Sequence, residues 1–209
     1  MVKAVATDES RDRGLSHVVV AGGTPAEWFE MSVADWKARL AALATGAAAA
    51  GAQWVTLLPR HGAELSRDDR HRYAVMLEET GKIASVDYGS GVRHVWRTDS
   101  GLTVIVDPVA DGHARFADVV ETMRHAGVPV DSVDEARLST ALLAPASEEP
   151  DLVIVLGPPG RIPTSMVWEL AYSELVFLDL SWGELNATHI ELAIDDFNRR
   201  HRRFGGLDS

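Results

Sequence analysis

Short apolar runs of strand length alternate with longer segments of helical period along most of this chain. The runs at 17–21, 53–58 and 151–156 read HVVVA, QWVTLL and DLVIVL. The last of them is apolar almost throughout, which is typical of a parallel strand covered on both faces. The intervening segments at 33–50, 66–81 and 132–143 carry helical spacing. This alternation predicts an α/β domain with a mostly parallel central sheet flanked by helices.

The remaining segments fit the same pattern. We expect strands over 92–97, 102–107 and 174–180, and helices over 116–126, 164–173 and 188–203, the last closed by the glycines at 205–206. The helix at 132–143 begins with Ser132 as N-cap and Glu135 three residues later, a capping-box pattern. The first fifteen residues lack any period. We therefore expect a flexible N-terminal tail over 1–15 and a single domain over 16–209.

Composition narrows the classes of function. The 209 residues include 20 Lys+Arg and 31 Asp+Glu, so the formal net charge is −11, and we expect no nucleic-acid partner and no binding to anionic membranes through bulk charge. The absence of cysteine excludes disulfides, thiolate metal sites and a cysteine nucleophile, and it fits a cytoplasmic location. No apolar run approaches the roughly 20 residues of a membrane span. The polar N-terminus is not typical of a signal peptide.

The last third of the chain carries a specific set of motifs. They are the strand DLVI at 151–154, then Gly157, Arg161, Trp168, the segment AYSEL at 171–175, Trp182, and RRFGG at 202–206. In this order and spacing they resemble the cis-prenyltransferase family, of the undecaprenyl diphosphate synthase type. The resemblance implies a cis-prenyltransferase-like fold. For a complete member it also implies Mg²⁺-dependent condensation of an allylic diphosphate with isopentenyl diphosphate.

The positions that the resemblance assigns to this chemistry carry unsuitable residue types. The family's metal-binding Asp corresponds to Gly23, and the Arg before Trp28 corresponds to Glu27. Further replacements are found at Pro25, His113, Val155, Pro159 and Pro163. Diphosphate sites need carboxylates that hold Mg²⁺ and arginine forks that bind phosphate oxygens, and proline removes N–H donors. We therefore expect no catalytic residue, no metal site and no cofactor in this chain by itself; Mg²⁺ would be held by a catalytic partner.

Two retained residues each have a functional and a structural interpretation. Arg161 either binds diphosphate or closes a loop. Glu174 matches a family carboxylate near the metal at the subunit boundary, but a residue that begins a strand beside the dimer face is the simpler interpretation.

The arginine cluster at 199–203 also has two interpretations. It is either a solvated helix end, where cations are favourable, or, as the resemblance implies, a segment whose Arg203, Phe204 and Gly205 complete the diphosphate site of a neighbouring subunit. The resemblance implies a dimer interface that contains Glu174, Trp182, Arg202 and Arg203.

These observations lead to one leading hypothesis and several alternatives. The leading hypothesis is a non-catalytic subunit that pairs with a catalytic cis-prenyltransferase homologue. The alternative assembly is a homodimer. In either assembly the protein can contact lipid products peripherally. One alternative is an enzyme of the same fold repurposed for another prenyl or terpenoid transfer. Another is a binding module whose tunnel, between the helices at 33–50 and 66–81, holds a lipid or other ligand.

Overall fold

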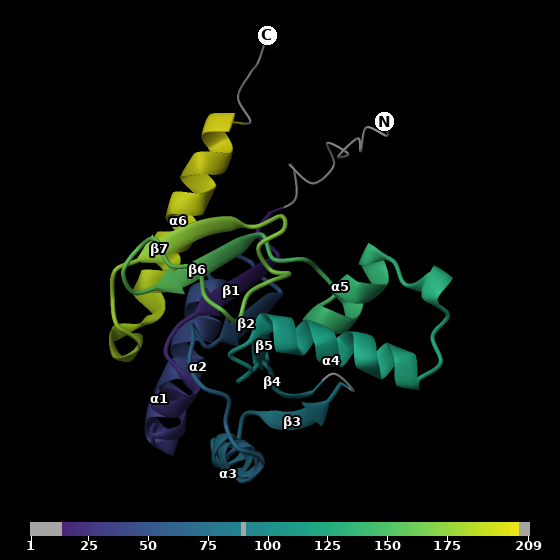
Figure 1. The fold of residues 1–209 in the computed structure, drawn as a ribbon. Coiled ribbons are helices and arrows are strands. Elements are labelled where there is room, and N and C mark those ends of the chain that lie inside the picture. Colours follow the sequence, from purple (N-terminus) through teal and green to yellow (C-terminus); the bar gives the residue numbers. More distant parts are fainter. Residues whose placement is uncertain (1–13, 89–90, 205–209) are drawn as a thin grey trace.

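The chain folds around one seven-stranded sheet. A computed structural model describes residues 14–88 and 91–204, and the strand order is β3-β4-β5-β2-β1-β6-β7 (Figure 1). The strands are β1 (His17–Ala21), β2 (Trp54–Leu58), β3 (Ala84–Asp87), β4 (Val92–Arg97), β5 (Thr103–Val106), β6 (Leu152–Leu156) and β7 (Glu174–Leu178). The run β5-β2-β1-β6-β7 is parallel, whereas β3 and β4 add antiparallel pairs at one end. The expected α/β architecture with a mostly parallel sheet is confirmed.

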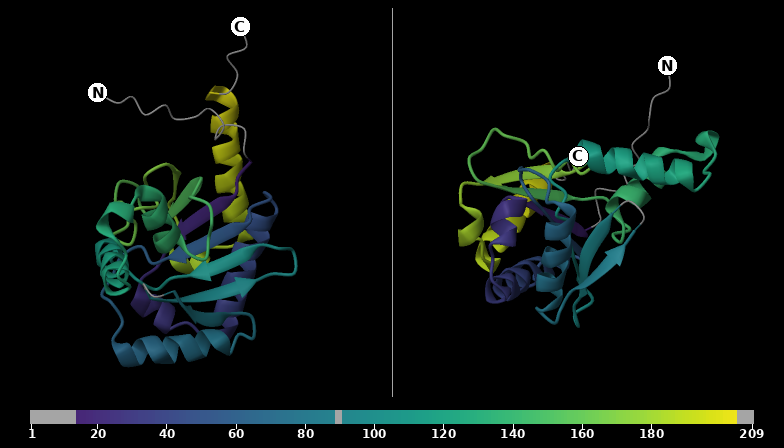
Figure 2. Two further views of the ribbon diagram at one scale, coloured as in Figure 1. Left: turned by 90° about the vertical axis from the view of Figure 1, so that its right-hand side faces the viewer. Right: turned by 60° about the horizontal axis from the view of Figure 1, so that its bottom comes forward.

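Helices cover both faces of this sheet (Figures 1 and 2). They are α1 (Pro25–Phe29), α2 (Val33–Ala48), α3 (Arg67–Glu78), α4 (Gly112–His125), α5 (Glu135–Leu143) and α6 (Ala187–Phe204), with short 3₁₀ turns η2 (Val130–Ser132) and η3 (Trp182–Glu184). Side chains of α2, α3 and α6 share one large core cluster, while α5 packs on the other face. None of the described helices combines the length and the apolarity that a membrane crossing needs.

Strand β1 runs through the centre of the core. All five of its residues are buried; Val18 and Val20 join the cluster under α2 and α6, whereas Val19 and Ala21 join the cluster on the opposite face. Successive side chains of a strand point to opposite faces. Full burial of an apolar strand on both faces is what a helix-covered parallel sheet requires.

The segment 164–173 is not a helix, and this expectation was wrong. Polar groups at its start bond to distant parts of the chain: the backbone N–H of Thr164 donates to the carbonyl of Arg60 at 3.1 Å, and the hydroxyl of Ser165 donates to the carbonyl of Pro59. The segment therefore consists of turns and bends over most of its length. Tertiary hydrogen bonds have replaced the helical ones.

Two boundaries also differ from expectation. Helix α5 begins at Glu135, and its cap is Asp134, whose carboxylate accepts from the N–H of Arg137 at 2.9 Å; Ser132 lies in η2. Leu15 is buried in the main core cluster, so the domain begins before residue 16. Residues 1–13 of the expected tail and the expected glycine cap at 205–206 lie outside the described residues. Strand β3 and helix α1 were not predicted.

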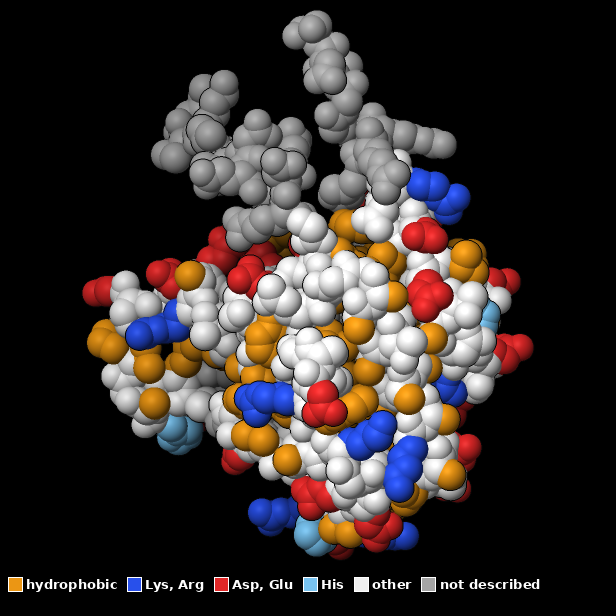
Figure 3. All heavy atoms as spheres, turned by 180° about the vertical axis from the view of Figure 1, so that it is seen from behind, with side chains coloured by type: hydrophobic (Ala, Val, Ile, Leu, Met, Phe, Trp, Pro, Cys, Tyr) orange, Lys and Arg blue, Asp and Glu red, His pale blue; other side chains and the backbone are white. Residues whose placement is uncertain are grey.

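Acidic and basic side chains are interspersed on the surface seen from behind (Figure 3). The net charge of −11 is therefore not gathered there into one continuous acidic field. Interspersed charges of both signs keep a surface soluble without creating a strong directional potential.

A buried histidine gives the fold a pH dependence. His94 of β4 is 2% exposed, and burial lowers its pKa from 6.5 to about 4. Its Nδ1 lies 3.0 Å from the hydroxyl of Ser85. Because the unfolded chain takes up this proton at a higher pH than the folded chain, stability is lost as the pH falls from 6.5 towards about 4. Burial also lowers the pKa of His17, which acts in the same direction.

We expect the midpoint of urea unfolding to fall as the pH is lowered through this window. A His94→Gln variant should show a weaker decline, because it removes one of the groups that titrates. A His113→Gln variant is the matched control, since the His113 side chain is 85% exposed, and it should keep the wild-type slope. If His94→Gln and the wild type lose stability equally, His94 does not carry the effect.

Candidate functional site

A cleft of about 320 Å³ opens where the parallel strands β1, β2 and β6 end. Its position follows from the topology: β1 lies between β2 and β6, and open α/β sheets bind ligands outside the carboxyl ends of strands where the strand order reverses. The lining residues come from the loops that follow these strands and from the segment before η3. They are Gly23, Thr24, Glu27, Arg60, His61, Leu156, Gly157, Pro158, Leu180, Ser181 and Trp182.

Tryptophan rings fill the space beside Gly23. The residue has φ +72°, and a Cβ added to it would lie 2.6 Å from Trp28 Nε1 and 2.9 Å from Trp182 Cγ. The Trp28 and Trp182 ring centroids are 5.7 Å apart, and Trp36 meets Trp28 edge-on at 5.8 Å. Trp28 is fixed by a 3.0 Å hydrogen bond from its Nε1 to the carbonyl of Gly22. No side chain, and so no carboxylate, fits at residue 23 unless these rings move.

The cleft does not suit Mg²⁺, the ion that the resemblance implies. Glu27 is the one carboxylate among the lining residues. Throughout residues 14–88 and 91–204, no group of three or more His, Cys, Asp or Glu side chains is arranged to hold a metal ion. Mg²⁺ takes oxygen ligands in near-ideal octahedral geometry. The residues present therefore do not fit this ion.

Arg60 is the cation of the cleft, and sequence reasoning did not single it out. It follows the end of β2, its N–H donates to the carbonyl of Gly23 at 2.8 Å, and its Nη2 donates to the carbonyl of Pro158 at 3.0 Å. A Cβ on Gly157 would lie 2.2 Å from Arg60 Nη1, so the guanidinium rests on a residue with no side chain. The feature that could have identified Arg60 from the sequence is its place just after the strand at 53–58. The carboxyl end of that strand lies at the central crevice of the sheet.

Of the residues expected to bind diphosphate, Arg161 follows β6, whereas Arg203 and Phe204 end α6. Arg161 is exposed and is not among the residues that line the cleft. The backbone of Arg202, Arg203 and Phe204 forms the last turn of α6, and nothing is described of their side chains; Gly205 lies outside the described residues.

Of the residues expected at a dimer interface, Glu174 begins the edge strand β7 and is half-buried. Trp182 is only 7% exposed and packs on Trp28 and Trp36, with the Arg39 guanidinium 4.3 Å above its ring. Trp182 is therefore packed mostly within its own chain, against α1 and α2, and the small part that stays exposed lines the cleft.

The region between α2 and α3, where a ligand tunnel was an alternative, is packed as core. The buried apolar side chains that these two helices contribute belong to a single cluster and are fully inaccessible; they are Trp36, Leu40, Leu43, Ala47, Tyr73 and Leu77. The Trp36 and Tyr73 rings meet edge-on, with centroids 5.7 Å apart. Aromatic side chains at such distances exclude solvent and ligand from the space between them.

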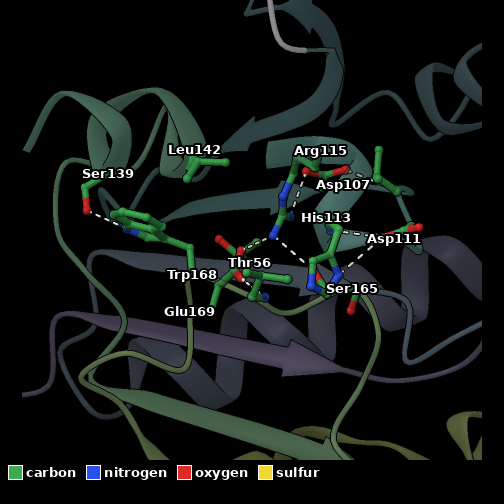
Figure 4. A network of polar contacts seen from close by, with 12 residues as sticks. Thr56, Asp107, Asp111, His113, Arg115, Ser139, Leu142, Ser165, Trp168 and Glu169 are labelled. Carbon is green, nitrogen blue, oxygen red and sulfur yellow. Dashed lines mark hydrogen bonds and ion pairs between the residues drawn. The ribbon is translucent and has the colours of Figure 1, made fainter. Parts of the chain in front are cut away.

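A buried ionic cluster fastens the 164–173 segment to the sheet (Figure 4). Arg115 of α4 lies 3.3 Å from the carboxylate of Asp107 and donates to Glu169, and Arg93 is 3.3 Å from the same Asp107 oxygen. Arg115 also donates to the carbonyl of Ser165 at 3.0 Å. These four charged side chains are each 3–4% exposed.

Their charges are balanced within the cluster. Burial by itself would raise the pKa of Asp107, but Arg115 and Arg93 together lower it, so Asp107 remains ionised. Burial opposes the charge on Arg115, and Glu169 and Asp107 outweigh it and raise the pKa of Arg115. Two arginines therefore face two carboxylates in a region without solvent, a strongly coupled arrangement.

The fold is that of solved prenyl diphosphate enzymes. A probable undecaprenyl diphosphate synthase from Campylobacter jejuni superposes with a TM-score of 0.58 at 12% identity, over 92% of this chain and 99% of that one. Lavandulyl diphosphate synthase from Lavandula x intermedia superposes with a TM-score of 0.53 at 12% identity, over 88% and 95%. At this identity the likeness establishes the fold alone.

Sequence relatives match part of the chain. The ditrans,polycis-undecaprenyl-diphosphate synthase of Lactiplantibacillus plantarum is 37% identical over 59% of this chain and 42% of its own length. The isoprenyl transferase of Bacillus subtilis is 33% identical over 43% of this chain and 34% of its own length. The matches thus span well under half of these relatives.

The family model described as "Putative undecaprenyl diphosphate synthase" matches residues 98–205. This stretch holds β5 to β7 with α4 to α6, whereas the loop at Gly23 lies outside it. The matched residues make up half of the chain, and the whole chain has the fold of the solved synthases. The chain therefore belongs to the undecaprenyl diphosphate synthase family of cis-prenyltransferases.

Proposed function

We propose that this chain does not elongate isoprenoid diphosphates by itself and acts as the non-catalytic partner subunit of a catalytic cis-prenyltransferase homologue. The observation that carries the proposal is the filled space at Gly23, where the family's metal-binding carboxylate would stand. A diphosphate leaving group needs its charge neutralised as the C–O bond breaks. Glu27 beside Gly23 adds negative charge to the cleft instead.

The half of the chain that matches the family model supports the partner role. Strand β7 is an edge strand, and on its α5-side face Leu175 and Phe177 are only half-buried. In the preceding segment Ile162 is 57% exposed and Tyr172 is 70% exposed. Partly uncovered apolar side chains beside a sheet edge favour burial against another subunit.

The C-terminal end of α6 also supports this role. In Figures 1 and 2 this end projects beyond the sheet, past the strands against which the rest of the helix packs. Arg199 and Arg200 near this end are exposed and lie close to Asp196. A projecting helix end with a basic sequence at 199–203 can reach a neighbouring subunit and contribute positive charge there.

We expect the purified chain to show no Mg²⁺-dependent condensation of farnesyl diphosphate with isopentenyl diphosphate. Affinity isolation from the native cell should recover a homologue that retains the catalytic Asp, in equal amount, and mixing the two purified chains should give at least the activity of that homologue alone. Turnover by the isolated chain would overturn the proposal, as would recovery of this chain only with itself.

A pair of surface variants separates interface loss from misfolding. Tyr172→Asp should weaken pairing, because it replaces an exposed ring beside β7 with a charge and removes the hydrogen bond to Glu135. Val130→Asp is the control: Val130 is 85% exposed and lies in η2, not in β7 or the segment before it. We expect pairing measured by analytical ultracentrifugation to be lost or weakened only in Tyr172→Asp. Equal pairing by both variants would place the interface elsewhere.

A further inference from the structure

Arg60 lies in the cleft without a counter-charge among the described residues. Arg93 and Arg115 each face a carboxylate, and Arg39 stacks on Trp182. The half-buried Arg60, by contrast, makes no ion pair with any described residue, although the chain has 31 Asp+Glu. Its recorded side-chain hydrogen bond goes to the neutral carbonyl of Pro158. A guanidinium that is not paired with a carboxylate of its own chain can bind an anion in a bidentate way.

The position of Arg60 is fixed before any ligand arrives. Its backbone N–H donates to Gly23 at 2.8 Å, its carbonyl accepts from Thr164 at 3.1 Å, and its Nη2 donates to Pro158 at 3.0 Å. Three loops thus meet at this residue. Because the side chain is already ordered, little conformational entropy remains to be lost when an anion binds.

The rest of the cleft favours a ligand that has one negatively charged group and an apolar remainder. The backbone N–H groups of Arg60 and Gly157 are already bonded, and prolines at 158 and 159 have none to donate. Arg60 is therefore the main charged donor, and Glu27 opposes further negative charge. The walls include the apolar side chains of Leu156, Leu180 and Trp182.

We propose that this cleft binds a small monocarboxylate with an apolar tail, held by the Arg60 guanidinium and independent of Mg²⁺. The guanidinium fork matches a planar carboxylate in a bidentate way. A volume of about 320 Å³ is enough for a small organic ligand. The proposal concerns ligand binding and not pairing with a homologue, so either property can fail while the other holds.

Titration of the ¹⁵N-labelled full chain with hexanoate tests this proposal. We expect saturable NMR shifts at the amides of Gly23, Gly157 and Ser181, unchanged by EDTA. Hexanol, which lacks the charge, should not reproduce them. Tighter binding of hexyl phosphate than of hexanoate would contradict the proposal that the ligand carries a single charge. The absence of saturable shifts with hexanoate would contradict the proposal that the cleft binds a carboxylate.

Three variants locate the interaction. Arg60→Gln should weaken hexanoate binding by about tenfold or more, as expected for loss of a charge-assisted bidentate contact. Arg67→Gln, at an exposed arginine on α3, is the control and should bind as the wild type does. Glu27→Gln, which removes the carboxylate that lines the cleft, should bind hexanoate more tightly. Wild-type affinity in both Arg60→Gln and Glu27→Gln would overturn the proposal, even if Arg60→Gln alone were destabilised.

Discussion

Replacing Arg115 by methionine is expected to lower the free energy of unfolding by about 3–5 kcal/mol, as found when one partner of a buried ion pair is removed. The side chain is 3% exposed and faces both Asp107 and Glu169. Without it, Glu169 loses its recorded ion-pair partner and Asp107 keeps only Arg93. Against a typical domain stability of about 5–15 kcal/mol, this loss is large. Urea unfolding followed by circular dichroism measures it.

The control for this variant is Arg124→Met on the same helix. Arg124 pairs with Glu121 on the surface of α4, where its side chain is 64% exposed. We expect a small change there, because solvent screens exposed pairs and offers the lone charge an alternative partner. If the two variants lose the same amount of stability, the buried cluster does not hold the 164–173 segment in place. The loss would then come from a general weakening of helix α4.

Introducing the family's acidic residue by Gly23→Asp is expected to destabilise the chain and to create no activity. The positive φ of +72° costs an L-residue roughly 1–2 kcal/mol. Overpacking against Trp28 and Trp182 adds about 1–3 kcal/mol. The unfolding free energy should therefore fall by the sum of these effects, and the Mg²⁺-dependent condensation assay should stay at background.

Gly51→Asp separates packing from backbone strain. Gly51 has a similar φ of +80°, but a Cβ there meets nothing within 4 Å, so only the backbone cost should be measured. The difference between the two variants reports the packing of the tryptophans around Gly23. Equal losses would show that the rings move aside at no cost. Restored turnover in Gly23→Asp would show that the missing carboxylate was the only defect of the site.

The predicted helix over 164–173 was wrong because groups far away in the sequence compete for the hydrogen bonds that a helix would make locally. The helix expected over 164–173 is absent because Thr164, Ser165 and Glu169 bond to Arg60, Pro59 and Arg115, which lie far away in the sequence. Local periodicity contains no information about those partners. The prediction succeeded for α2 and β1, where the apolar pattern and the tertiary environment agree.

The candidate site was likewise predicted only in part from the sequence. Sequence motifs identified the family and located Gly23, but they placed Trp182 at a subunit surface, whereas its ring lies in the core beside Gly23. They did not single out Arg60. Both residues acquire their roles from loops that meet at the carboxyl ends of β1, β2 and β6.

The sequence by itself determined the alternation of strands and helices, the family motifs from 151 onward and the loss of an acidic residue at Gly23, because each of these depends on residue type and on spacing along the chain. Only the tertiary structure decided that tryptophans close the space at Gly23 and that Arg60 stands in the cleft without a counter-charge. The physical reason is that excluded volume and charge pairing act between atoms that are close in space, and the folded sheet brings together loops that are far apart in sequence.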